Sequence, residues 1–142
     1  MVSGGHRAVP RAADIAVEAW ADSREECLAE EVRALVDIFA RFHDAVPDDS
    51  VEFALMEETD ETLLVAVLNE VIYQIETYGR VAVDVSVDER TGATQGQIEV
   101  RLGTVPLAAV DQVGTVPKAV ALHGVRFGRE AGMWRAHATV DV

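Results

Sequence analysis

The hydrophobic period of the chain changes at Arg80, and this change limits the folds that the sequence can adopt. Before it, two long segments carry apolar residues three and four positions apart, the spacing of one helix face. After it, the valines of residues 81–88 alternate with small or polar residues, as in a strand with one buried face. A chain with both helices ahead of most of its strands is typical of α+β proteins.

Each predicted helix begins at a recognisable capping residue. A glutamate lies three positions after Ser23, as in a capping box, and the apolar stripe that follows predicts a helix to residues 43–44. Thr59 precedes a second helix that should end at Gly79, since glycine readily adopts the left-handed conformation found after helices. Residues 63–68 carry no charge, so we expect the second helix to be the more buried of the two.

The remaining apolar segments predict strands. Two precede the first helix, one lies between the helices, and the others follow the second helix. The predicted strands are residues 6–10, 14–20, 51–56, 81–88, 97–102, 119–127 and 133–142, with turns at 89–92 and 128–132, a break at 103–106 and a loop at 107–116. This order predicts two helices packed on a largely antiparallel β-sheet, in a single domain of residues 1–142.

The charge balance limits the classes of partner that the protein can bind. Twenty-five acidic residues oppose 12 basic ones, a formal net charge of −13, and Lys118 is the one lysine. Tight binding of phosphate groups needs clustered basic residues, whereas the arginines are scattered singly along the sequence, without interleaved aromatic residues. We therefore expect no strong direct binding of nucleic acid, and favour a cation or a basic protein surface as the partner.

Membrane insertion and disulfide formation are not expected either. No apolar run approaches the roughly 20 residues of a membrane span, and the first residues lack the apolar core of a signal peptide. The single cysteine, Cys27, cannot form an internal disulfide, which fits a reducing cytoplasm. Glutamates beside it would raise a thiol pKa, so we interpret Cys27 as a packing residue.

Motifs for familiar chemistry are missing from the sequence. The four histidines show no zinc-binding spacing, and no glycine-rich phosphate loop begins either helix. The acidic clusters 48–49 and 57–61 fit a turn and a helix start. His123 stands out among the histidines because it precedes Gly124, where a ligand or another backbone segment could approach closely.

Acidic residues near the two ends of the chain are the remaining candidates for a site. Residues 138–142 predict a strand that runs to the terminal carboxylate, and Asp14 lies at the start of another strand. If these strands are neighbours, Asp14, Asp141 and the carboxylate of Val142 would offer the oxygen ligands that Ca²⁺ and Mg²⁺ prefer. The alternative is that both aspartates are ordinary exposed residues at strand ends.

Five short segments, in a fixed order, resemble the archease family. They are Gly5-His6-Arg7, Ala13-Asp14-Ile15-Ala16-Val17, Leu68-Asn69-Glu70-Val71, Lys118-Ala119-Val120-Ala121-Leu122-His123-Gly124 and Thr139-Val140-Asp141-Val142. The resemblance extends from Gly5 to Val142. It implies an α+β fold and an accessory protein rather than an enzyme, which activates an RtcB-type RNA ligase by promoting its guanylylation and turnover in tRNA splicing or RNA repair.

The resemblance also implies a metal site. It assigns a divalent cation, calcium in this family, to Asp14, Asp141 and the C-terminal Val142. Lys118 and His123 lie in a segment that the family shares, so the resemblance places them on the surface that acts on the ligase.

The chain departs from the family pattern at one point. The family usually has His-Thr before Ala-Asp, whereas this chain has Arg11-Ala12. The guanidinium group of Arg11 could pair with Asp14 and compete with a cation there, so we regard Arg11 as a possible modifier of the site.

Two other functions stay open at this point. The protein could be a chaperone or modulator of another RNA-processing enzyme, such as a tRNA methyltransferase. It could also be a small metal-dependent hydrolase that uses Asp14, Asp141 and His123, although the sequence offers no nucleophile or general base at a recognisable spacing. The sequence leaves the RNA substrate, the identity of the cation and the oligomeric state open.

Overall fold

The computed structural model describes residues 4–10, 14–42, 44–89 and 97–142, which form two α-helices, ten strands and one 3-10 turn. The helices are α1 (Arg24–Asp37) and α2 (Asp60–Tyr78), and the 3-10 turn is Leu107–Ala109. The strands are β1 (Gly5–Pro10), β2 (Asp14–Ala21), β3 (Ala40–Arg41), β4 (Asp49–Leu55), β5 (Arg80–Glu89), β6 (Ile98–Pro106), β7 (Asp111–Gln112), β8 (Ala119–Val120), β9 (Arg126–Glu130) and β10 (Met133–Asp141).

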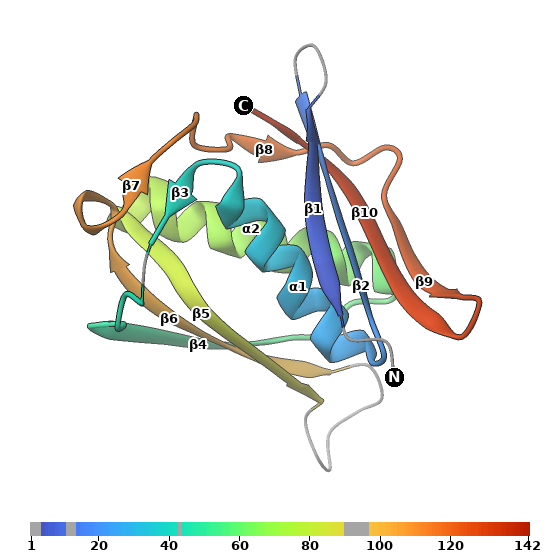
Figure 1. The fold of residues 1–142 in the computed structure, drawn as a ribbon. Coiled ribbons are helices and arrows are strands. Elements are labelled where there is room, and N and C mark those ends of the chain that lie inside the picture. Colours follow the sequence, from blue (N-terminus) through green and yellow to red (C-terminus); the bar gives the residue numbers. More distant parts are fainter. Residues whose placement is uncertain (1–3, 11–13, 43, 90–96) are drawn as a thin grey trace.

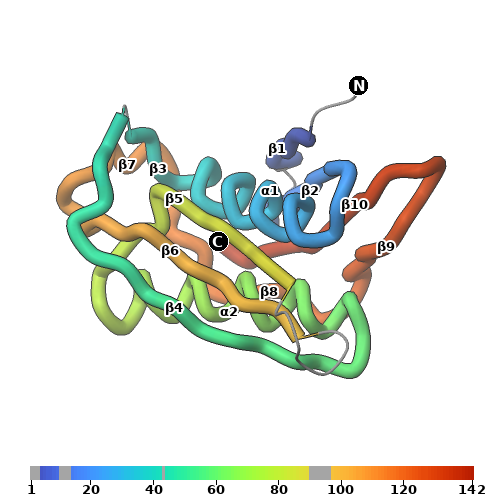
Figure 2. Tube along the Cα trace, turned by 90° about the horizontal axis from the view of Figure 1, so that it is seen from below, coloured from blue at the N-terminus to red at the C-terminus, as the bar shows by residue number. Residues whose placement is uncertain are grey.

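The strands form three antiparallel sheets around the helices (Figure 1). One has the order β1-β2-β10-β8, with β9 also paired to β10; the second is β4-β6-β5; β3 and β7 form the third. Helix α1 packs against β1 and β2 of the first sheet and against β5 of the second. Figure 2 shows the second sheet in front of both helices. The predicted fold class is confirmed, and its strands are divided between sheets on different sides of α1.

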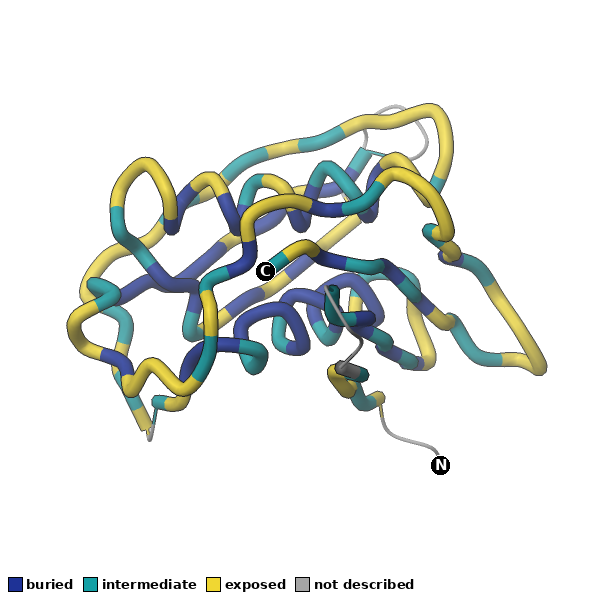
Figure 3. The backbone as a smooth tube through the Cα atoms, turned by 90° about the horizontal axis from the view of Figure 1, so that it is seen from above, coloured by how far each residue is buried: buried dark blue, intermediate teal, exposed yellow. Residues whose placement is uncertain are grey.

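Helix α1 is the more buried helix, which corrects the expectation from the sequence. Eight of its 14 residues are buried, against eight of the 19 residues of α2. A hydrophobic stripe predicts only one covered face, whereas α1 packs against β1 and β2 of one sheet and against β5 of another. Figure 3 shows the buried segments of the chain in dark blue. In the described ranges, neither helix is long and apolar enough to cross a membrane.

The predicted helix starts are confirmed, and one of the two predicted ends is wrong. The Ser23 hydroxyl accepts a hydrogen bond from the Glu26 N–H at 3.1 Å, and Thr59 caps α2. Gly79 ends α2 with φ of 64°, in the left-handed conformation predicted for it. Helix α1, however, ends at Asp37, because the chain then turns to form β3, which pairs with β7.

Two strand predictions also need correction. Strand β6 does not break at 103–106 but continues to Pro106, and Gly103 fits there because a Cβ atom would lie 2.7 Å from Pro47. The predicted strand 119–127 is interrupted by an exposed bend at Gly124, whose φ is 76°. The predicted turn at 89–92 lies mostly outside the described residues.

The thiol of Cys27 is fully buried, as a packing residue should be. Burial raises its pKa to about 12, and the nearby carboxylates of Glu31 and Glu30 add to the shift. The thiolate form needed for nucleophilic chemistry is therefore disfavoured.

Glu31 is the most unusual residue of the core. It lies on the buried side of α1 with 0% exposure, and neither carboxylate oxygen has a hydrogen-bond partner among the described residues. Burial, with a contribution from Glu18, raises its pKa well above the ordinary value. The folded protein therefore retains a proton on Glu31 that the unfolded chain releases above pH 4.5, and the free energy of unfolding should fall as the pH rises through this window.

We predict that Glu31→Gln removes this contribution to the pH dependence, because the amide has no proton to lose. Glu31→Leu should also raise the free energy of unfolding at pH 8 by about 1–3 kcal/mol, the usual cost of an unsatisfied buried polar group. Urea unfolding at pH 5 and pH 8 measures both effects, and Glu58→Gln, at an exposed position, is the control. An unchanged pH slope in Glu31→Gln would contradict the assignment.

Candidate functional site

The pairing of β2 with β10 brings the two predicted acidic ligands together. In this antiparallel pair, Asp141 lies directly opposite Asp14, and Val142 follows at once. The strands that carry the two aspartates are thus neighbours, which is the condition on which the predicted cation site depends. Directly opposed side chains have Cβ atoms about 4.5–5.5 Å apart, close enough for both carboxylates to reach one ion.

The surroundings of Asp14 fit a cation. Its Oδ1 atom is buried and has no hydrogen-bond partner among the described residues. An oxygen-only set of ligands suits calcium or magnesium better than zinc. The described residues contain no group of three or more His, Cys, Asp or Glu side chains that could hold a metal. Main-chain oxygens, the carboxylate of Val142 or water could supply further ligands.

Lys118 lies beside the acidic pair. Its backbone N–H donates to the carbonyl oxygen of Asp141 at 2.8 Å, and Ala119 is the register partner of Asp141. Its side chain is exposed. The structure therefore brings together Asp14, Asp141 and Lys118, three of the residues predicted from the sequence.

His123, another predicted residue, does not join this group. His123 lies on the exposed bend after β8, and the described residues form no cluster in which it joins Asp14 and Asp141. The arrangement needed for a hydrolase with these three residues is therefore not present in this part of the chain. Arg11, the possible modifier of the site, lies outside the described residues.

A largely apolar groove lies beside His123, and the sequence did not point to it. It has a volume of about 400 Å³ between α2 and the bend. Its lining includes Val65, Ala66, Leu122 and Val125, together with Glu57 and Glu61. Leu122 is 80% exposed, although it is among the most hydrophobic side chains. We call this surface the Leu122 groove.

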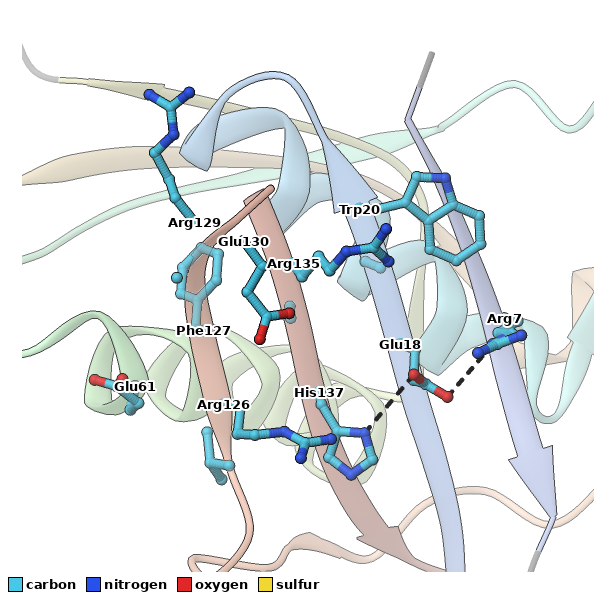
Figure 4. A pocket seen from close by; sticks show the side chains of 14 residues that line it. Arg7, Glu18, Trp20, Glu61, Arg126, Phe127, Arg129, Glu130, Arg135 and His137 are labelled. Atoms are coloured by element: carbon cyan, nitrogen blue, oxygen red, sulfur yellow. Dashed lines mark ion pairs between the residues drawn. The ribbon is translucent and has the colours of Figure 1, made fainter. Parts of the chain in front are cut away.

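A second groove, of about 510 Å³, lies over the outer face of the first sheet (Figure 4). Arg7, Trp20, Arg126, Arg135 and His137 line it, and we call it the arginine groove. The sequence suggested that the arginines are scattered and lack aromatic neighbours, and the structure corrects this. These residues come from four strands, so only the pairing of the strands could show that they meet.

Strand β1, which carries Arg7, is fastened to α1 through His6. The Nδ1 atom of His6 lies 2.6 Å from Glu30 Oε2, and Nε2 lies 2.7 Å from Asp37 Oδ2. Burial alone would lower the pKa of His6, but the hydrogen bonds and charges of these carboxylates outweigh it and raise the pKa. The protonated ring therefore joins the edge strand to the helix, and this contribution to stability is lost as the pH rises through the raised pKa.

The fold, with Asp14 and Asp141 opposed at one end of the β2–β10 pair (the acidic strand end), defines a small α+β protein with a candidate site for a cation bound by oxygen ligands. Residues 6–142 match the model of the archease protein family. A probable archease of Mycobacterium tuberculosis is 39% identical over 140 residues, which cover 99% of this chain and 76% of that protein. An archease of Methanopyrus kandleri is 28% identical over 135 residues, 94% of this chain and 96% of that protein.

Two solved structures have the same fold. Protein 1598 of Methanobacterium thermoautotrophicum has a TM-score of 0.75 and 17% identity, covering 97% of this chain and 99% of its own. A Thermotoga maritima crystal structure, described as an archease and possible chaperone, has a TM-score of 0.65 and 23% identity, covering 94% of each chain. With the family match over nearly the whole sequence, the chain belongs to the archease family.

Without a cation, the opposed aspartates should destabilise the fold, because like charges directly across a sheet repel each other. We predict that Asp141→Asn raises the free energy of unfolding in a chelating buffer by about 0.2–1 kcal/mol. Asp84→Asn is the matched control, because Asp84 faces Gly103 and has no charged side chain directly opposite. Chemical denaturation measures the difference, and equal effects of the two substitutions would contradict the repulsion.

Proposed function

We propose that this protein is an accessory factor that activates an RtcB-type RNA ligase in the cytoplasm, by promoting guanylylation and turnover of the ligase. Membership of the archease family supports an accessory role. The observation that carries the proposal is the register of β2 and β10, which places Asp14 opposite Asp141 beside Lys118. A cation there and an exposed lysine would form one compact surface that the ligase can contact.

We infer that Asp14, Asp141 and the carboxylate of Val142 hold the cation, which we take to be calcium. When bound, the cation would neutralise the opposed carboxylates and restrain the end of β10. The residues of the chain do the rest: the backbone N–H of Lys118 holds the carbonyl oxygen of Asp141, and this bond ties the segment before β8 to the site. Ordering of this segment would then depend on the occupied site.

The Leu122 groove favours a second, related role as a chaperone. Large exposed apolar side chains often mark surfaces that bind other proteins. Glu57 and Glu61 line the same groove, so a partner segment with apolar and basic side chains would fit it. We propose that the groove binds either the ligase or another RNA-processing enzyme, such as a tRNA methyltransferase.

The test of the activating role is a guanylylation and multiple-turnover ligation assay with the RtcB-type ligase of the same organism. We predict that the protein increases both rates and that Asp14→Ala abolishes the increase, because half of the opposed carboxylate pair is lost. Asp84→Asn, which also removes one carboxylate, should stimulate like the parent protein. Unchanged ligase rates with the parent protein would contradict the proposal.

The groove has its own test. We predict that Leu122→Asp weakens binding of the partner at least about tenfold, since it places a charge in an apolar contact. The stability of the protein itself should change little, because Leu122 is 80% exposed. Val113→Asp, at another exposed apolar position, is the control. Equal binding by Leu122→Asp and the parent protein, measured by calorimetry, would show that the groove is not the contact surface.

A further inference from the structure

The arginine groove has a regular construction that follows from strand register. In one row across the sheet, Arg7 faces Glu18, Glu18 faces His137, and His137 faces Arg126. The neighbouring row on the same face consists of Gly5, Trp20, Arg135 and Gly128. The two rows are two residues apart along each strand, about 7 Å. An aromatic ring and several cations therefore share a small area of one sheet face.

The guanidinium groups of this groove differ from those elsewhere in the molecule. Outside the groove, most described arginines are held by carboxylates. These pairs are Arg24 with Glu25 and Asp60, Arg33 with Glu26 and Glu30, Arg80 with Asp48, and Arg101 with Glu52. In the groove, Arg7 pairs with Glu18 at 3.4 Å. No described carboxylate lies within 4.0 Å of a charged nitrogen of Arg126 or Arg135. In a chain of net charge −13, these two are cations left available for an anion.

Two glycines shape the space around these side chains. The indole ring of Trp20 lies over Gly5, where an added Cβ atom would come within 2.6 Å of the ring. At the other end of the row, an added Cβ atom on Gly128 would meet nothing within 4 Å. The Trp20 ring therefore fills the space at the Gly5 end of the row. The Gly128 end is open, beside Arg126 and Arg135 (Figure 4).

We propose that the arginine groove binds a nucleotide, either free or at the end of an RNA strand. The phosphate would lie between Arg126 and Arg135, because guanidinium groups bind phosphate oxygens through paired N–H donors. The base would stack on Trp20, a contact that tolerates any base because every base has an aromatic face. A volume of about 510 Å³ is in the range of small-molecule sites.

The surrounding charge limits what else the groove can bind. A long nucleic acid would extend over a surface of net negative charge, which opposes it. Glu18, Glu61 and Glu130 also line the groove, so a polyacidic peptide would meet carboxylates on several sides. A single nucleotide needs only Arg126, Arg135 and the Trp20 ring. It is small enough to avoid most of the repulsion from the acidic surface. The site is distinct from the acidic strand end and does not depend on the proposed function.

The test is two-dimensional NMR of the isolated protein with adenosine 5′-monophosphate, a short 5′-phosphorylated RNA, inorganic phosphate and an oligoglutamate peptide. The chain has two tryptophans, so the indole N–H of Trp134, which packs against Phe127, serves as an internal reference. We expect the two nucleotide probes to shift the Trp20 indole peak and to bind more tightly than inorganic phosphate. Tighter binding of the RNA would identify a strand end as the ligand, and equal binding a single nucleotide.

Three variants make the proposal specific. Arg135→Gln should weaken nucleotide binding at least about fivefold, since it removes a charged donor. Gly128→Val should block the groove while leaving every charge in place, because the added atoms enter open space. Arg101→Gln removes the same charge as Arg135→Gln, but from β6 of the second sheet. This control variant should bind nucleotide like the parent protein.

Several outcomes would overturn the proposal. They are an unmoved Trp20 peak with both nucleotide probes, inorganic phosphate binding as tightly as the nucleotides, stronger binding of oligoglutamate, or an equal loss of binding in Arg101→Gln and Arg135→Gln.

Discussion

The structure depends above all on the pairing of β2 with β10. This register places Asp14 opposite Asp141 at one end of the strand pair and Trp20 opposite Arg135 at the other, on the same face of the sheet. The two ends are about 20 Å apart, from the rise of a strand. A slip by one residue would turn each of these side chains toward α1 and bring core residues such as Val17 to the outside. The buried core face thus fixes the register, and the register determines both candidate sites.

The same core carries an electrostatic cost. Glu31 is buried without a hydrogen-bond partner among the described residues, and its raised pKa shows that the fold favours its protonated form. His6 also lies on the side of the first sheet that faces α1, where the charged ring joins Glu30 and Asp37 of the helix. Both groups make the protein less stable as the pH rises above their unfolded-state pKa values. Stability at neutral pH therefore rests on apolar packing around α1, together with the strand pairing that encloses it.

Local patterns predicted the elements, and pairing between distant strands decided what they could not predict. The caps at Ser23 and Thr59 and the glycine after α2 depend on a few neighbouring residues, so the sequence is enough to find them. The meeting of Asp14 and Asp141 could be stated only as a condition, because no local signal pairs the second strand with the last. The arginine groove was missed entirely, since its residues belong to four strands. The bend at Gly124 was missed because Ala119 to Phe127 has the composition of one continuous strand.

The account rests on the claim that the opposed aspartates form a cation site, and calorimetric titration of the metal-free protein with Ca²⁺ tests it most directly. We predict one calcium ion per chain for the parent protein and no measurable binding by Asp14→Asn or Asp141→Asn. Because each substitution replaces only one carboxylate oxygen with an amide nitrogen, the strand pairing should be retained, and circular dichroism can verify this. Calcium binding that persists unchanged in both variants, or that is absent from the parent protein, would contradict the claim.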